Sequence, residues 1–150
     1  MNHEFYIKEC ISLAKRSAEF GEIPVGAMLL QKNKIISKAH NTSISLNDPT
    51  GHAEINAIRD ACKKINNYRI SDAILYVTLE PCLMCISAIC EARIDLVVFG
   101  AYTSNEKNFF SKYDFIKKEF RFNHKPKFMG GILENECSIL MKEFFKAKRG

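Results

Sequence analysis

Apolar residues recur every three or four positions in three segments of the chain, residues 3–20, 50–66 and 134–149. This spacing places them on one face of an α-helix, so the sequence predicts an amphipathic helix in each segment. Gly21 follows the first segment, where a glycine commonly ends a helix. Asp48 and Thr50 are residues of the type that caps a helix, and we expect them at the start of the second.

Short apolar runs between these helices predict strands. The runs occupy residues 25–31, 35–40, 73–79 and 94–100. A Lys-Asn-Lys tripeptide separates the first two, which favours an antiparallel pair joined by a tight turn. Between the last two lies a short apolar helix ending near residue 92, in which Pro81 suits the first position. A strand, a helix and a strand in so short a span predict parallel pairing through a right-handed crossover.

The remaining segments are less regular. Residues 101–111 are polar apart from two adjacent phenylalanines and predict either a loop or a short helix, and residues 127–132 predict a short edge strand. The first 20 residues hold acidic side chains and no continuous apolar run, so we expect neither a signal peptide nor a membrane span, and a cytoplasmic enzyme. No linker or repeat interrupts the chain, and we predict one domain over residues 1–150.

One window of the chain, residues 47–85, collects groups that bind zinc. His52 and Glu54 lie in "NDPTGHAE", and Cys82 and Cys85 lie in "TLEPCLMC". In a reducing compartment metal binding is favoured over disulfide formation for such cysteines. One imidazole and two thiolates leave a tetrahedral zinc ion with one open position, where catalysis could take place.

The spacing of these residues predicts how they meet. Cys82 and Cys85 are three positions apart at a helix start, so both sulfurs lie on one side of its first turn. His52 and Glu54 are two apart and share a site only if His52 lies at the frayed start of its helix. Glu54 could then carry protons from zinc-activated water to a leaving nitrogen. A redox cysteine pair and a closed structural zinc site are the alternatives.

The motif His-x-Glu followed by Pro-Cys-x-x-Cys is the signature of the zinc-dependent nucleobase deaminases. Further segments resemble the bacterial tRNA-specific adenosine deaminases, and these are residues 22–30, Asn41, 47–59, 67–85, 93–101 and 123–149. The resemblance implies a three-layer α-β-α cytidine deaminase-like fold with a central five-stranded mixed sheet. It also implies a homodimer with one Zn²⁺ per subunit that converts adenosine to inosine at the wobble position of a tRNA anticodon stem-loop.

Individual roles follow from the same resemblance. His52, Cys82 and Cys85 match the zinc ligands, and Glu54 matches the proton shuttle while zinc-bound hydroxide attacks C6 of adenine. Asn41 and Val25 match residues of the base pocket, and a turn residue is the alternative interpretation of Asn41. The matching RNA-binding residues in the tail are Phe144, Phe145, Lys146, Lys148 and Arg149. Favourable charge at a helix end is the competing explanation for the basic tail.

Net charge and one atypical segment bear on the substrate. The net charge of +5 favours a polyanionic partner, and basic residues gather at residues 117–127 and 142–149. After residue 101 the chain departs from the family pattern of an Asp, a Lys, a Gly-Ala pair and a Gly, and carries instead Thr103, Asn105, Lys107, Asn108 and Phe110. We expect this segment to affect substrate choice. The alternatives are a deaminase of a free base or nucleotide, such as guanine or cytosine, and a non-catalytic tRNA-binding protein with structural zinc.

Overall fold

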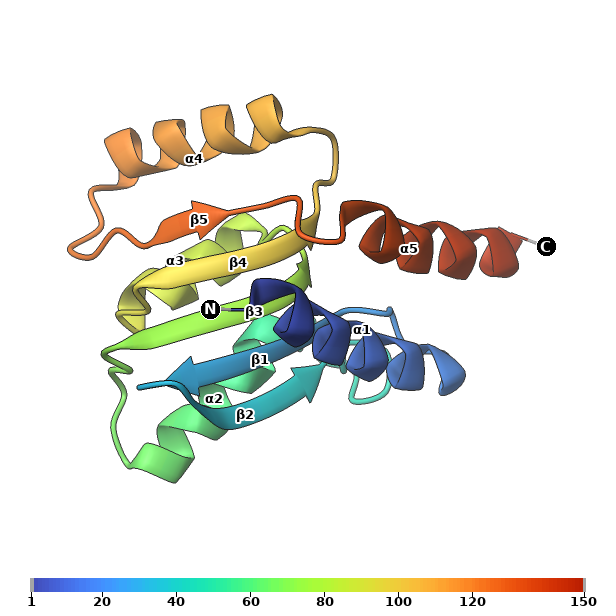
Figure 1. Cartoon of the computed structure of the whole chain (residues 1–150), viewed down its shortest axis with the longest axis horizontal. Helices are drawn as coiled ribbons and strands as arrows, with labels where there is room; N and C mark the ends of the chain where they lie inside the picture. The colour runs from blue at the N-terminus through green and yellow to red at the C-terminus, as the bar shows by residue number, and fades with distance from the viewer. Residues whose placement is uncertain (1, 150) are drawn as a thin grey trace.

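The computed structural model describes residues 2–149, which form five helices and one five-stranded sheet (Figure 1). The elements in chain order are α1 (His3–Glu19), β1 (Gly26–Gln31), β2 (Lys34–His40), α2 (Ala53–Ile65), β3 (Ala73–Leu79), α3 (Leu83–Glu91), β4 (Leu96–Ala101), α4 (Glu106–Phe120), β5 (Lys127–Met129) and α5 (Glu134–Arg149). The helices and strands that the sequence predicts are confirmed in type and order, whereas the full length of α4 is not predicted. That residues 1–150 form a single domain stays a prediction, which the sheet shared by these elements favours.

The sheet is mixed, as predicted, with the strand order β2-β1-β3-β4-β5. Strand β1 is antiparallel to both β2 and β3, whereas β3, β4 and β5 run parallel. Helix α3 makes the crossover from β3 to β4, and α4 makes the crossover from β4 to β5. Because parallel neighbours require such crossovers, helices come to cover the sheet, and the three-layer α/β prediction is confirmed.

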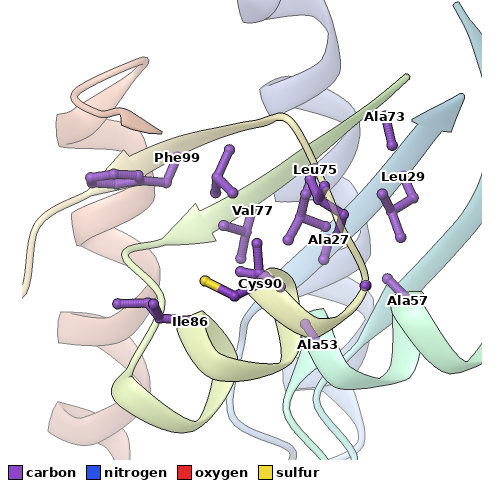
Figure 2. Close-up of a cluster of buried hydrophobic side chains, with 14 of the residues drawn as sticks. Ala27, Leu29, Ala53, Ala57, Ala73, Leu75, Val77, Ile86, Cys90 and Phe99 are labelled. Carbon is purple, nitrogen blue, oxygen red and sulfur yellow. The ribbon is translucent and has the colours of Figure 1, made fainter. Parts of the chain in front are cut away.

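Two apolar cores lie on opposite faces of the sheet, since alternate strand residues point to opposite sides. Ala27 and Leu29 of β1 pack with α2, α3 and α4, while Met28 and Leu30 pack with α1 and α5. Figure 2 shows the first of these cores, with Val77 of β3 above α3 and Leu29 of β1 above α2. The predicted zinc ligands lie on the face of the sheet that α2 and α3 cover, at the N-termini of these two helices.

Three sequence expectations about helix boundaries are wrong. Helix α2 begins at Ala53 rather than near residue 50, because Asp48 accepts hydrogen bonds from the backbone and side chain of Thr50 inside the preceding loop. Pro81 lies before α3, whose N-cap is Cys82. Residues 102–105 form a loop and residues 106–111 begin α4, which is longer than the short helix expected because it extends to Phe120.

Helix α4 forms because its buried residues recur at helical intervals, at Phe109, Tyr113 and Ile116. Asn105 caps it by accepting a hydrogen bond from the backbone N–H of Asn108 at 2.8 Å. Phe110 and the surrounding lysines obscure this stripe in the sequence.

Among residues 2–149, no helix is both long and apolar enough to cross a membrane.

Gly26 lies where α1 crosses β1 at close range. A Cβ at this position would overlap the carbonyl oxygen of Cys10 and come within 3.0 Å of Leu13 Cβ. We therefore expect Gly26→Ala to lower the free energy of unfolding by about 3 kcal/mol, measured by urea unfolding. Gly21→Ala is the comparison, because Gly21 has φ of +78° but open space around it and should cost only about 1 kcal/mol. Equal losses in the two variants would contradict this account of Gly26.

Candidate active site

Three predicted ligand atoms converge where α2 and α3 begin. His52 is the N-cap of α2, with extended backbone angles of φ −75° and ψ 152°, and its imidazole makes no capping bond. Cys82 is the N-cap of α3, and Cys85 lies in the first turn of that helix. The Nδ1 atom of His52 lies 3.6 Å from Cys82 Sγ and 3.5 Å from Cys85 Sγ. The condition that His52 lies at the helix start is therefore met.

The spacing of these three atoms fits a zinc ion. Bonds of about 2.0 Å to nitrogen and 2.3 Å to sulfur at tetrahedral angles place N and S about 3.5 Å apart. The observed separations match this value, and all three ligand atoms lie within 4.8 Å of one another. In the described part of the chain this is the one group of three or more such side chains with metal-binding geometry. The donor set therefore suits zinc and offers three ligands, as in catalytic rather than structural sites.

The two thiols influence each other. A hydrogen bond between the two cysteine side chains is the main cause that lowers the pKa of the Cys82 thiol, to about 5. The same hydrogen bond, with burial, raises the pKa of Cys85. Cys82 is thus the thiol that ionises first in the absence of metal, whereas a metal ion binds both as thiolates.

Glu54 is the second residue of α2 and is 4% exposed. Burial raises the pKa of its carboxyl to about 7, against the opposing effects of its own backbone N–H, the His52 charge and a hydrogen bond with Cys85. A carboxyl group with a pKa near neutrality can both accept and donate a proton at the working pH. Its contact with Cys85 places it next to the ligand cluster, as the sequence predicts.

Asn41 lies at the end of β2 and holds the start of α2 in place. Its Oδ1 accepts a hydrogen bond from the backbone N–H of Ala53 at 2.9 Å, and its own backbone N–H donates to Val25 at 3.1 Å. Within residues 2–149 its Nδ2 group makes no hydrogen bond. Asn41 is therefore more than a turn residue, because one end of its amide is fixed and the other end is available as a donor.

A pocket of about 270 Å³ opens above this cluster. Its wall contains His52, Glu54, Cys82, Asn41 and Val25, which are all residues singled out in the sequence. Thr103, from the atypical segment expected to affect substrate choice, lines the pocket as well. Sequence reasoning missed several other lining residues, among them Ile23, Leu79, Glu80, Lys112 and Met141. Some of these lie in segments that carry no motif, so only their convergence in the fold reveals them.

The tail residues divide into two groups. Phe145 is 44% exposed and lines the pocket, and Lys146 and Arg149 line an adjacent hollow that begins at the same phenylalanine. Phe144 and Lys148 line neither hollow, and the Lys148 ammonium lies 5.5 Å from the centre of the Phe144 ring. Lys142 lines the adjacent hollow as well, although the sequence marked it only as part of a basic run.

Comparisons with known proteins agree with this geometry. Residues 1–101 match the cytidine and deoxycytidylate deaminase zinc-binding region. The chain is 47% identical over 148 residues to the tRNA-specific adenosine deaminase of Buchnera aphidicola subsp. Baizongia pistaciae, covering 97% of this chain and 90% of that protein.

Solved structures are also similar, and two of them bear on function. One comes from studies of A-to-I editing by tRNA:A34 deaminases at the wobble position of transfer RNA (TM-score 0.79, 34% identity, 91% of this chain and 98% of that one). The other is a guanine deaminase from Bacillus subtilis (TM-score 0.67, 35% identity, 99% and 94%). The chain thus belongs to the cytidine and deoxycytidylate deaminase zinc-binding family, in the group of the tRNA-specific adenosine deaminases.

Proposed function

We propose that this protein is a zinc-dependent tRNA adenosine deaminase, which hydrolyses adenosine to inosine at the wobble position of an anticodon. The observation that carries the proposal is the buried Glu54 carboxyl beside the His52, Cys82 and Cys85 cluster, under a pocket that is open to solvent. Three ligands with an adjacent proton carrier suit hydrolysis, whereas a structural zinc site would have four ligands. The similarity to tRNA-specific adenosine deaminases along nearly the whole chain supports the choice of substrate.

His52 would bind the zinc ion through Nδ1, and Cys82 and Cys85 would bind it through their thiolates. A zinc ion in such a site lowers the pKa of water and supplies the nucleophile for hydrolysis. Glu54 would accept the proton that the attacking water loses and pass it to N1 of the adenine ring. The same carboxyl would then take the second proton from the hydroxyl now on C6 and deliver it to the amino group, so that ammonia leaves as its bond to C6 breaks and the C6 carbonyl of inosine forms. Burial suits Glu54 to this exchange, because it brings the pKa to about 7.

Asn41 would donate its free Nδ2 hydrogen bond to the nucleotide in the pocket, and Val25 would form an apolar wall against the base. We expect Asn41→Asp to lower kcat/KM at least about 30-fold, because the variant keeps an acceptor for Ala53 but replaces the Nδ2 donor with a negatively charged oxygen in the pocket that Glu54 also lines. Urea unfolding should show some loss of stability, since the new carboxylate is buried. Asn41→Ala should lower stability as well, since it leaves the Ala53 N–H without its partner. Full activity in Asn41→Asp would show that Nδ2 makes no contact with the substrate.

An anticodon stem-loop suits this pocket, because the loop bases are already unpaired and little energy is needed to extrude one. Phe145 at the pocket mouth offers a ring for stacking, and Lys146 and Arg149 in the adjacent hollow offer positive charge for phosphates.

We further propose that the protein acts as a homodimer. The exposed Leu83, which directly follows Cys82, is an apolar side chain that a partner subunit could cover.

The decisive experiment incubates the zinc-loaded protein with an anticodon stem-loop that carries adenosine at the wobble position. We expect inosine at that position and none in the corresponding Glu54→Ala reaction. Free guanine is the second substrate to test, because the guanine deaminase from Bacillus subtilis is 35% identical to this chain. Turnover of guanine without any change in the RNA would favour a free-base deaminase. Binding of the stem-loop without inosine formation would favour a non-catalytic RNA-binding protein.

A further inference from the structure

An ion pair between a buried carboxylate and a partly exposed ammonium forms part of the pocket wall. Glu80 follows β3, directly before the Pro81 and Cys82 that lead into α3, and it is 6% exposed. Its Oε1 accepts a hydrogen bond from the backbone N–H of Thr103 at 2.6 Å, and its Oε2 lies 2.8 Å from Lys112 Nζ. The Glu80 carboxylate therefore links three parts of the chain: the loop that carries Cys82, the segment that follows β4, and helix α4.

Lys112 is the exposed member of this pair. Its side chain is 40% exposed, against 3% for that of Glu80, and its ammonium lies 5.2 Å from the centre of the Phe109 ring. An ammonium group has three N–H donors, and only the one toward Glu80 has a partner among residues 2–149. Lys112 is also the one lysine or arginine among the described residues that line the pocket.

The pocket lining carries negative charge that a polynucleotide would have to approach. Glu54 and Glu80 both line the pocket, and either of them repels a phosphodiester when it is ionised. Lys112 offsets the charge of Glu80 and leaves two donors for an anion. Compensation of the buried Glu80 carboxylate uses one donor of the ammonium and leaves the other two without a partner among residues 2–149.

We propose that Lys112 binds a phosphodiester group that flanks the nucleotide whose base enters the pocket, and that Glu80 positions the ammonium for this contact. The inference rests on the proposed function, since it presumes an RNA substrate. It also gives a role to the atypical segment at residues 102–110. That segment supplies Thr103, which bonds Glu80, and Asn105, which caps the helix that carries Lys112.

The test compares an anticodon stem-loop with a second one in which neutral methylphosphonates replace the two phosphates flanking the target adenosine. Dissociation constants are measured by fluorescence anisotropy at several salt concentrations. We expect the wild-type protein to bind the neutralised RNA about 10-fold more weakly. Lys112→Met should bind the natural RNA about 10-fold more weakly than wild type and show no further loss on the neutralised RNA. Its slope of log affinity against log salt should be smaller by about 0.7.

Matched variants separate this role from a structural one. Lys112→Arg keeps the charge and should retain sensitivity to the methylphosphonates, as should Lys118→Met on the exposed part of the same helix. Because Lys112→Met leaves a buried carboxylate unpaired, the double variant Glu80→Gln with Lys112→Met is measured too. It removes both charges, keeps an acceptor for Thr103, and should behave like Lys112→Met on both RNAs.

Two results would overturn the inference. One is a wild-type protein that binds both RNAs equally, and the other is a Lys112→Met variant that loses as much affinity on the neutralised RNA as wild type does. Failure of the proposed function looks different, because the wild-type protein would then leave the adenosine unchanged. The binding comparison does not depend on turnover and decides the role of Lys112 in either case.

Discussion

We expect the Glu54→Gln variant to form inosine about 10³-fold more slowly than the wild-type protein. Glutamine has nearly the same shape as glutamate but cannot accept the proton of the attacking water or pass it to the base. Glu54 is not a member of the ligand cluster, which consists of His52, Cys82 and Cys85. Zinc content and RNA affinity should therefore stay close to their wild-type values. Single-turnover kinetics with a saturating concentration of protein measure the loss at the chemical step alone.

Asp60→Asn is the matched control for Glu54→Gln. Asp60 lies on the same helix, α2, but its side chain is 43% exposed and pairs with Lys64 on the surface at 2.9 Å. Removing its charge should leave the rate within about twofold, because surface ion pairs contribute little. A Glu54→Gln variant that kept a tenth of the wild-type rate would show that another group carries the proton.

The Cys85→Ser variant should lose its zinc and with it all measurable activity. Serine would place a hydroxyl where the fully buried Cys85 has its sulfur. A hydroxyl binds zinc more weakly than a thiolate and at a different distance. Removal of the metal should also destabilise the wild-type protein. Protein in free zinc at 1,000 times the dissociation constant should have a free energy of unfolding about 4 kcal/mol higher than the same protein after a chelator has removed the zinc. Metal analysis and urea unfolding with and without the chelator measure both effects.

Cys90→Ala is the matched control for the ligand variant. Cys90 lies on the same helix, α3, and is 3% exposed, but it belongs to the apolar core and not to the ligand cluster. We expect this variant to lose some stability through the smaller side chain and yet to keep its zinc and its response to the chelator. If Cys85→Ser responded to the chelator as strongly as Cys90→Ala, Cys85 would not be a zinc ligand.

The local patterns predicted most helices and strands because each depends on residues close in sequence. The apolar stripe of α1 and the alternating core residues of β1 are examples, since their faces follow from the periods of a helix and a strand. Helix α4 escaped detection because its buried residues are interleaved with Phe110 and lysines. Phe109 is 1% exposed and Phe110 is only partly buried, and this difference arises from how α4 packs on the sheet.

The start of α2 shows how tertiary contacts decide a boundary. Asp48 and Thr50 are good capping residues by type, yet they bond each other inside the loop. The first helical N–H, that of Ala53, is bound by Asn41, twelve residues earlier in the chain. This leaves His52 free at the N-cap with its imidazole turned to the cysteines. A side chain from a neighbouring strand end cannot be anticipated from local capping preferences alone.

The sequence by itself determined the zinc-binding chemistry, because ligand type and spacing within residues 47–85 depend on two short motifs at helix starts. It also determined the family, through motifs spread along the chain. Only the tertiary structure decided the rest of the pocket, where Glu80 and Lys112 meet from segments 32 positions apart. The physical reason is that such contacts depend on how the crossovers stack helices on the sheet, and that stacking leaves no periodic trace in the residues it brings together.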